Sequence, residues 1–256
     1  MTDFRKYALL VGNTRGATGA SLDIESYHNF LRSCVGGAWN KDEIETLFNP
    51  TCQSLTEKLD FCKSLDLDYF LFIFSGHGGI NRESGETIME LRRGEDISES
   101  CLDCIASRQL SIMDCCRDAG SEEEEVQANR RLIKEANYYN RTMIRAVYEK
   151  ALCDASKFHS RIYACRKGEC AIREYSSGGV FSQGFIEMAN KLATTSESEL
   201  VYLDDCFIRT ATVTQTEEQH PDAKLPKTKR QLPWAVNKKH FALYENITGG
   251  FINPIF

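Results

Sequence analysis

The sequence lacks the features that place a chain in a membrane or on the secretory pathway. No apolar run approaches the roughly 18 residues that a membrane-spanning helix needs. The amino-terminal residues Met1 to Lys6 contain no apolar stretch of the kind that a signal peptide carries. We therefore expect no membrane span, and a protein that is made and kept in the cytoplasm.

Positively charged residues are also fewer than negatively charged ones. The 256 residues include 31 Lys and Arg against 37 Asp and Glu, which gives a formal net charge of −6. This balance argues against a general nucleic-acid-binding protein, which usually carries a basic excess. Hydrophobic residues make up 42% and charged residues 27% of the chain. These fractions suffice for the core of one α/β domain and argue against global disorder.

Cysteine, by contrast, is abundant, and a disulfide framework does not explain it. The count is 11, an odd number, and no secretory segment accompanies it. Cys101 and Cys104 form a C-x-x-C pair, but no second pair stands at zinc-ribbon spacing. A zinc or redox module, which would lose its fold with a chelator, remains an alternative. We assign no metal site and expect most thiols to be small buried side chains in a reducing compartment.

Two apolar runs that each end in a reactive side chain are the most informative feature. Residues 69–74 predict a buried strand that leads into Ser75-Gly76-His77-Gly78, and residues 109–113 predict another that leads into Asp114-Cys115-Cys116. In open α/β sheets, sites form just beyond the carboxyl ends of parallel strands. One strand end would therefore present an imidazole and the other a thiol.

Other segments fit the same α/β alternation, which implies parallel strands joined by right-handed crossovers. The acidic and polar stretch from Ser121 predicts a surface helix or a flexible linker, and the lysine-rich residues 216–231 predict a surface loop. The remaining predicted elements are strands at 7–12, 160–166 and 231–236, and helices at 20–34, from Thr51 to about Ser64, and after Gly178.

The two strand ends have the chemistry of a cysteine nucleophile with its base. His77 lies between two glycines, where the chain can bend, and is the candidate general base; Cys116 is the candidate nucleophile. The backbone N–H groups of Cys116 and Gly78 would stabilise the developing oxyanion. Cys115 and Cys116 are adjacent, and strand alternation points them to opposite sides, so only one can face His77. Taken singly, such a histidine is usually a surface residue and such a cysteine inert; their combination favours catalysis.

These motifs resemble those of caspase-fold cysteine proteases, and in style those of metacaspases and bacterial caspase-like proteases. The segment from Ser75 to Gly78 is similar to the family's S-G-H-G motif, and the segment from Asp114 to Arg117 to its D-x-C motif. Three further segments support the resemblance, which covers residues 7–236: Gly19 to Asp23, Gly179 to Ser182 and Arg230 to Pro233. Metacaspases usually have His-Ser-Gly after the nucleophile, whereas this chain has Arg117-Asp118-Ala119.

The resemblance implies an α/β fold of the caspase type. This fold is a three-layer sandwich with a mainly parallel central sheet flanked by helices. One peptidase domain would span residues 1–256. It would divide into a large-subunit-like portion over about 1–120, a linker-like insertion over about 121–155 and a small-subunit-like portion over about 156–256.

The resemblance also implies a substrate pocket formed by Asp23, Ser75 and Asp114. Two carboxylates in one pocket would select a protein or peptide substrate with Arg or Lys before the scissile bond. Without the resemblance, Asp23 fits a first-turn helix acid equally well, and Asp114 a carboxylate that positions Arg117. Self-processing would then use basic residues of the linker-like insertion, namely Arg130, Arg131, Lys134 and Arg141.

Regulation and partners stay open at this point. The resemblance implies no required cofactor and admits calcium as an activator, with Glu122 to Glu125 as an acidic cluster to which no ligand role is assigned. A regulated protease that activates a partner protein, in bacterial defence or cell death, is the leading hypothesis. A catalytically silent scaffold and a zymogen that awaits an activator are the alternatives. The sequence does not decide between monomer and dimer.

Overall fold

The computed structural model describes residues 4–15, 17, 19–118, 125–126, 141–174, 176–225 and 232–241. Its centre is a six-stranded sheet in the order β13-β9-β7-β3-β1-β2. All neighbouring strands of this sheet are parallel except β13, which pairs antiparallel with β9. The strands are β1 (Lys6–Gly12), β2 (Ile44–Phe48), β3 (Tyr69–Ser75), β7 (Arg108–Asp114), β9 (Phe158–Tyr163) and β13 (Asp222–Lys224).

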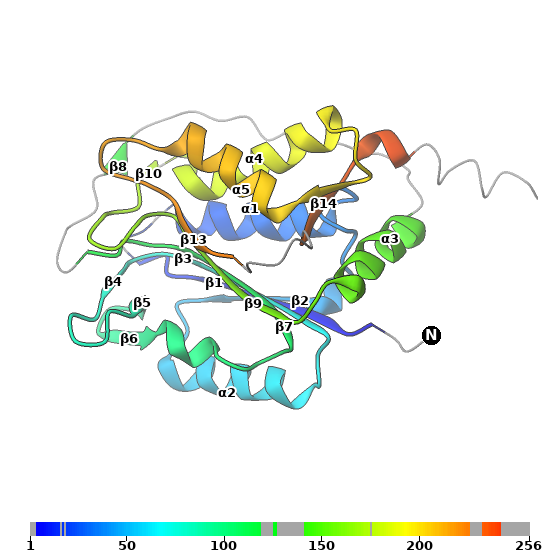
Figure 1. Ribbon diagram of the computed structural model, residues 1–256. Coiled ribbons are helices and arrows are strands. Elements are labelled where there is room, and N and C mark those ends of the chain that lie inside the picture. Colours follow the sequence, from blue (N-terminus) through cyan, green and yellow to red (C-terminus); the bar gives the residue numbers. More distant parts are fainter. Residues whose placement is uncertain are drawn as a thin grey trace, which may run out of the picture.

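Helices cover both faces of the sheet, so the molecule has three layers. Figure 1 shows α1, α4 and α5 on one face and α2 on the other. The helices are α1 (Ala20–Arg32), α2 (Cys52–Ser64), α3 (Arg141–Asp154), α4 (Val180–Thr195) and α5 (Leu203–Thr214). The predicted three-layer sandwich with a mainly parallel central sheet is confirmed (Figure 1). No described helix is long and apolar enough to cross a membrane.

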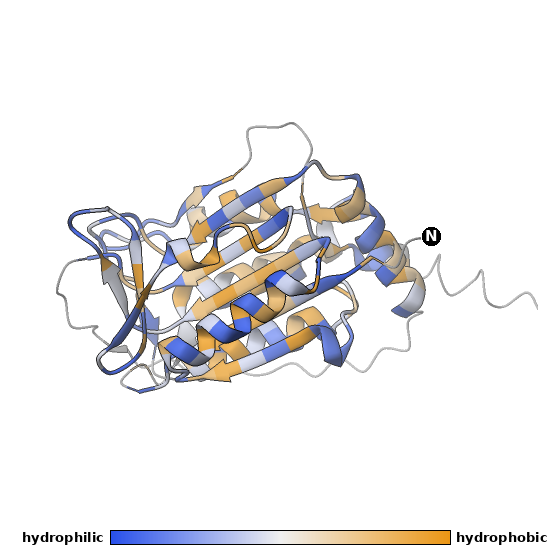
Figure 2. Cartoon of the chain, turned by 90° about the horizontal axis from the view of Figure 1, so that it is seen from below, coloured by the Kyte–Doolittle hydropathy of each residue, from blue (hydrophilic) through white to orange (hydrophobic). Residues whose placement is uncertain are grey.

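The alternation of side chains along each strand explains the two cores. In β3, Leu71 and Ile73 belong to the apolar cluster that includes α1, α3 and α4, whereas Phe70, Phe72 and Phe74 belong to the cluster that includes α2. All five side chains are fully buried. Strands covered on both faces need such continuous apolar runs. Figure 2, viewed from the α2 side, shows the central strands in predominantly hydrophobic colours.

Three small sheets complete the fold. One of them, β4-β5-β6, continues directly from β3 and lies at the carboxyl end of the parallel strands, on the left of Figure 1. Their strands are β4 (Gly78–Ile80), β5 (Thr87–Arg92), β6 (Glu95–Ser98), β8 (Glu125–Val126), β10 (Arg173–Glu174), β11 (Gly178–Gly179), β12 (Leu200–Tyr202) and β14 (Pro233–Val236). The late strand predicted at 231–236 corresponds to β14, which pairs with β12 rather than with the central sheet.

One predicted segment differs from the structure, and in a second the structure selects the helix from two predicted alternatives. The surface loop predicted at 216–231 contains β13, the antiparallel edge strand of the central sheet. The part of the linker-like insertion from Arg141 onward forms α3, in which Ile144, Tyr148 and Leu152 recur at four-residue spacing and are buried. The polar residues on its other faces concealed this apolar stripe. Arg130, Arg131 and Lys134 lie outside the described residues.

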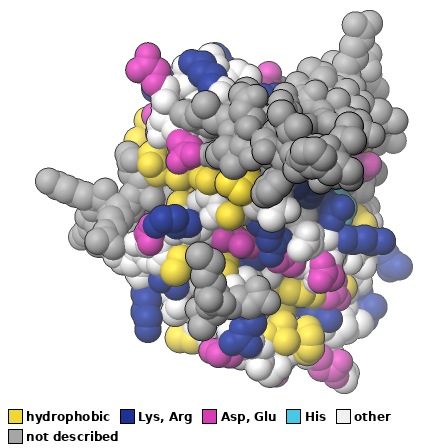
Figure 3. Space-filling model, turned by 90° about the vertical axis from the view of Figure 1, so that its right-hand side faces the viewer, with side chains coloured by type: hydrophobic (Ala, Val, Ile, Leu, Met, Phe, Trp, Pro, Cys, Tyr) yellow, Lys and Arg dark blue, Asp and Glu magenta, His cyan; other side chains and the backbone are white. Residues whose placement is uncertain are grey.

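A cluster of ion pairs joins α3 to the start of β1. The amino group of Lys6 is buried and contacts the carboxylates of Glu43 and Glu149, and both carboxylates also bind Arg145. Burial is the largest influence on Lys6 and lowers its pKa. Figure 3 shows the end of the molecule next to α3, where acidic and basic side chains are interspersed.

Candidate active site

The pairing of β3 with β7 brings the two candidate catalytic residues to neighbouring strand ends. Ser75 lies opposite Asp114 in the parallel register. His77 and Cys116 each follow two residues later, and the Gly76 N–H donates to the Asp114 carbonyl oxygen at 3.1 Å, which holds the two strand ends together. His77 is half-buried, and Cys116 is 2% exposed.

The two adjacent cysteines have different surroundings. Cys115 is fully buried and belongs to the apolar cluster on the α2 side of the sheet. Its sulfur lies directly under the backbone of Gly78, where a Cβ would be only 2.7 Å away from it. Cys116 belongs to neither apolar cluster. Cys115 thus packs in the core on the α2 side of the sheet, whereas Cys116 lies outside both apolar clusters.

The close approach under Gly78 also explains why that position has no side chain. A Cβ there would lie 2.7 Å from both the Cys115 sulfur and the Ile88 carbonyl oxygen. Because Gly78 opens β4 immediately after His77, its backbone stays close to the end of β7. This is the position from which its N–H would serve as an oxyanion donor.

Arg117 anchors the segment that carries the candidate nucleophile. Its guanidinium is fully buried, lies 3.7 Å from the ring centroid of Tyr163, and donates to the Thr87 hydroxyl at 3.1 Å and the Cys165 carbonyl at 3.1 Å. The Asp222 carboxylate on β13 is 3.3 Å away. The backbone N–H of Arg117 donates to the Glu169 carbonyl oxygen at 2.9 Å. These contacts fix the backbone immediately after Cys116.

The three residues predicted to form a substrate pocket do come together. The Ser75 hydroxyl donates to Asp23 Oδ2 at 2.7 Å, and Asp114 ends the neighbouring strand. All three side chains are buried. Asp23 lies in the first turn of α1, so it is a first-turn helix acid and also lies next to Ser75. We call Asp23, Ser75 and Asp114 the acidic site.

An arginine that the sequence analysis did not identify fills the acidic site. Arg173 Nη1 donates to Asp23 Oδ2 at 3.0 Å and to the Ser75 hydroxyl at 2.8 Å. Its Nη2 donates to the Asp114 carbonyl oxygen at 3.1 Å and lies 3.8 Å from Asp114 Oδ1. Asp23 and Arg173 are 150 positions apart in the chain. No local pattern therefore signals the contact.

Backbone and side-chain donors of the β11–α4 segment complete the site. Asp23 accepts from the Gly179 N–H at 2.9 Å and from Gln183 Nε2 at 2.8 Å. Asp114 Oδ2 accepts from the Ser182 N–H at 3.1 Å and from its hydroxyl at 2.5 Å. A Cβ on Gly179 would lie 2.3 Å from Asp114 Oδ2. Glycine is therefore required there for the backbone to reach the carboxylates.

The surroundings of Asp23 in the acidic site raise its pKa. Burial, and next the nearby charge of Asp114, raise the pKa of Asp23 from 3.8 to about 6. Arg173, Ser75 and Gln183 oppose this by stabilising the carboxylate. The contact between Asp23 and Arg173 is a buried ion pair, since both side chains are at most 1% exposed.

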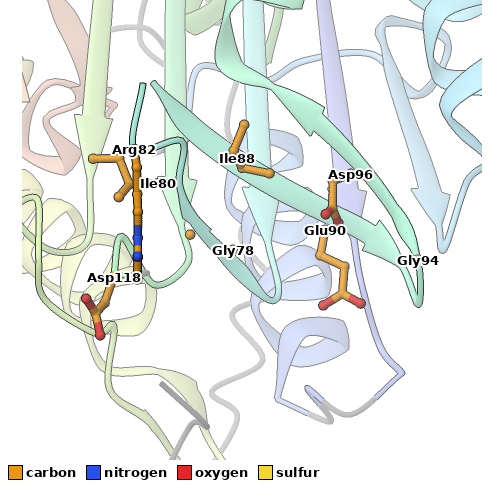
Figure 4. A pocket seen from close by; sticks show the side chains of 9 residues that line it. Gly78, Ile80, Arg82, Ile88, Glu90, Gly94, Asp96 and Asp118 are labelled. Carbon is orange, nitrogen blue, oxygen red and sulfur yellow. The ribbon is translucent and has the colours of Figure 1, made fainter. Parts of the chain in front are cut away.

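A groove of about 450 Å³ lies beside Gly78, between the β4-β5-β6 sheet and Asp118. Figure 4 shows Arg82, Ile80 and Asp118 on one side and Ile88, Glu90 and Asp96 on the other. Three carboxylates and one guanidinium thus line the groove, whose electrostatic character is acidic. Since it adjoins the strand ends that carry His77 and Cys116, an extended peptide could occupy it.

Metal binding finds no support in the described part of the chain. No group of three or more His, Cys, Asp or Glu side chains among those residues could hold a metal ion. The side chains of Glu122 to Glu125, named above in connection with calcium, lie outside the described residues. None of the 11 cysteines, Cys101 and Cys104 included, forms a disulfide bond.

Comparisons with known proteins identify the family and the fold of the chain. A family model described as a caspase domain matches residues 5–242. The fold is similar to the crystal structure of caspase-1 from Spodoptera frugiperda, with a TM-score of 0.58 and 10% sequence identity over 91% of this chain and 92% of that chain. At this identity the likeness establishes the fold alone. No match was found among curated protein sequences.

Proposed function

The chain belongs to the caspase family of cysteine endopeptidases, and we propose that it cleaves proteins with Cys116 as nucleophile and His77 as general base. The Cys116 sulfur attacks the scissile carbonyl carbon while His77 holds the thiol proton. The N–H groups of Cys116 and Gly78 stabilise the oxyanion. The peptide C–N bond then breaks, and His77 gives the proton to the leaving amine. Water, activated by His77, hydrolyses the thioester and regenerates the thiol.

One observation carries this proposal: the parallel register that sets Ser75 opposite Asp114. It places the two candidate residues equally far beyond the ends of adjacent strands. The buried contacts of Arg117 hold the nucleophile segment, and the packing of Cys115 accounts for the other thiol. A pre-organised backbone of this kind is what transition-state stabilisation needs.

We further propose that cleavage follows Arg or Lys. The convergence of Asp23 and Asp114 on one buried site supports this preference, because a guanidinium or ammonium group would neutralise them. The acidic lining of the groove beside Gly78 favours basic peptides as well. An acidic side chain would meet like charges in both places. Calcium is retained as a candidate activator, to be tested directly.

The test is hydrolysis of fluorogenic peptides that end in Arg, Lys or Asp, with and without calcium, by the wild type, Cys116→Ala and Cys115→Ala. We expect cleavage after Arg or Lys. Cys116→Ala should lose it by on the order of 10³-fold or more, since the nucleophile is gone. Cys115→Ala is the matched control and should stay active. Activity that survives in Cys116→Ala, or a preference for Asp, would refute the assignment.

Self-processing is part of the same proposal. Arg130, Arg131 and Lys134 are the candidate sites, whereas Arg141 is engaged, since it donates to the carbonyl oxygens of Arg32 and Trp39. Replacing the first three residues with Gln should abolish a wild-type cleavage product seen on a denaturing gel. Unchanged fragments in the triple variant would exclude these sites.

A catalytically silent scaffold is the second candidate. Two observations favour it: Cys116 is 2% exposed, and Arg173 already fills the acidic site. The same observations fit a regulated protease in the cytoplasm, kept inactive until a signal arrives in a defence or cell-death response. Hydrolysis that Cys116→Ala abolishes would exclude the scaffold, whereas no hydrolysis of any peptide would leave both the scaffold and a protease whose activator is absent.

A further inference from the structure

We propose that Arg173 is a specificity-determining residue that acts as a built-in occupant of the acidic site, which a basic substrate side chain must replace. This inference rests on the proposed function, since it concerns access to the same site. The guanidinium of Arg173 makes the contacts that a substrate guanidinium would make. It donates to both Asp23 and Ser75 and lies beside Asp114.

While Arg173 is bound, hydrogen bonds from within the chain already occupy the Asp23 carboxylate. Both oxygens of Asp23 already accept hydrogen bonds, from Arg173, Ser75, Gly179 and Gln183. The Arg173 side chain is 1% exposed. Its stem is closely packed, because a Cβ on Gly19 would lie 3.0 Å from Arg173 Cγ. A substrate arginine therefore competes with Arg173 for the same carboxylates rather than binding next to it.

The occupant lies on a short element, because β10 has two residues and pairs with β11 on one side and with β8 on the other. Arg173 lies on the two-residue strand β10, which pairs with Gly178 and Gly179 of β11. The Gly179 N–H and the Arg173 guanidinium both bind Asp23, so a displacement of β10 together with β11 would break both contacts. A basic substrate can bind only to molecules in which the site is open. Its apparent affinity is therefore the intrinsic affinity multiplied by the fraction of open molecules.

Removing the occupant should therefore create a receptor for guanidinium ions. In Arg173→Ala, two buried carboxylates lose their counter-charge, and the vacated volume has the shape of a guanidinium. Methylguanidinium at millimolar concentration is the probe, with tetramethylammonium as the ionic control. We expect a saturable rise in the melting temperature of Arg173→Ala with methylguanidinium only. The wild type and Arg166→Ala, which removes an exposed arginine of the preceding loop, should show none.

Peptide hydrolysis supplies the second readout. The neutral variants Arg173→Ala and Arg173→Gln should cleave Arg peptides with kcat/KM raised by about ten-fold or more, chiefly through a lower KM, because no internal cation competes. Arg173→Gln keeps a shorter, neutral side chain that can still form hydrogen bonds, so it serves if the alanine variant folds poorly. An alanine variant that refolds on addition of methylguanidinium would support the proposal as well.

Two results would overturn the proposal. One is a melting temperature of Arg173→Ala and Arg173→Gln that methylguanidinium raises no more than that of the wild type. The other is loss, in both variants, of cleavage after Asp by a wild type that shows it, which would make Arg173 a direct ligand of an acidic substrate. Because the melting assay needs no catalysis, it tests Arg173 even if no peptide is hydrolysed and the proposed function itself fails.

Discussion

At the scale of single residues, Asp23 determines most of the chemistry of the acidic site. It is fully buried, it binds Arg173 and Ser75, and its pKa is raised to about 6. Burying a carboxylate is costly unless it is paired and hydrogen-bonded, and here Arg173 and three other donors supply that compensation. The raised pKa shows that the compensation is incomplete.

This raised pKa predicts a specific dependence of stability on pH. Between the ordinary value of 3.8 and about 6, the folded chain holds a proton on Asp23 that the unfolded chain has released. The contribution of Asp23 to the free energy of unfolding therefore falls as pH rises through this window and is constant above it. Urea unfolding of the wild type and Asp23→Asn at several pH values isolates the contribution. The difference in the free energy of unfolding between the wild type and Asp23→Asn should change with pH across this window. A difference that is the same at every pH would contradict the raised pKa of Asp23.

At the scale of elements, one local contact and one contact from a distant residue bind the backbone N–H groups at the amino-terminal end of α2. The Thr51 side chain accepts from the Ser54 N–H at 2.9 Å, so Thr51, where the sequence predicted the helix to begin, is its N-cap. The Cys52 N–H donates instead to the Glu95 carboxylate of β6 at 2.7 Å. Only the first of these contacts is visible as a sequence pattern, because Glu95 is far away along the chain.

The cap gives a prediction for this element. Thr51→Ala leaves the Ser54 N–H without its acceptor and should destabilise the protein by about 1 kcal/mol. Thr51→Ser keeps the hydroxyl and is the matched control. Peptidase activity should be unaffected, since α2 lies on the face of the sheet opposite the acidic site. Denaturant unfolding of both variants provides the measurement, and equal loss in both would show that the hydroxyl is not the cause.

At the scale of the whole molecule, the two portions on either side of residues 119–140 form one folded unit. Strands β7 and β9, from different portions, are parallel neighbours in the middle of the sheet. Phe30 of α1 packs against Trp234 of β14 with ring centroids 5.3 Å apart. The buried Lys6 reaches Glu149 of α3. The sheet, the core and the ion pairs all cross the boundary between the portions.

Cleavage of the linker should therefore not separate the portions. A recognition site for an unrelated protease, placed between residues 127 and 134 of Cys116→Ala, allows a controlled cut. We expect two bands on a denaturing gel but a single peak at the size of the uncut protein on gel filtration. Two separate peaks would show that the covalent connection is needed to hold the sheet together.

The sequence by itself determined the elements whose signals are local. The unbroken apolar runs of β3 and β7 require burial on both faces, and Thr51 marks the start of α2. The positions of His77 and Cys116 follow from the strand ends. Tertiary structure alone decided the rest: that Arg173 fills the acidic site, that Cys115 packs beneath Gly78, and that residues 222–224 form an edge strand. Those outcomes depend on contacts between residues far apart in the chain, and such contacts leave no periodicity in the local sequence.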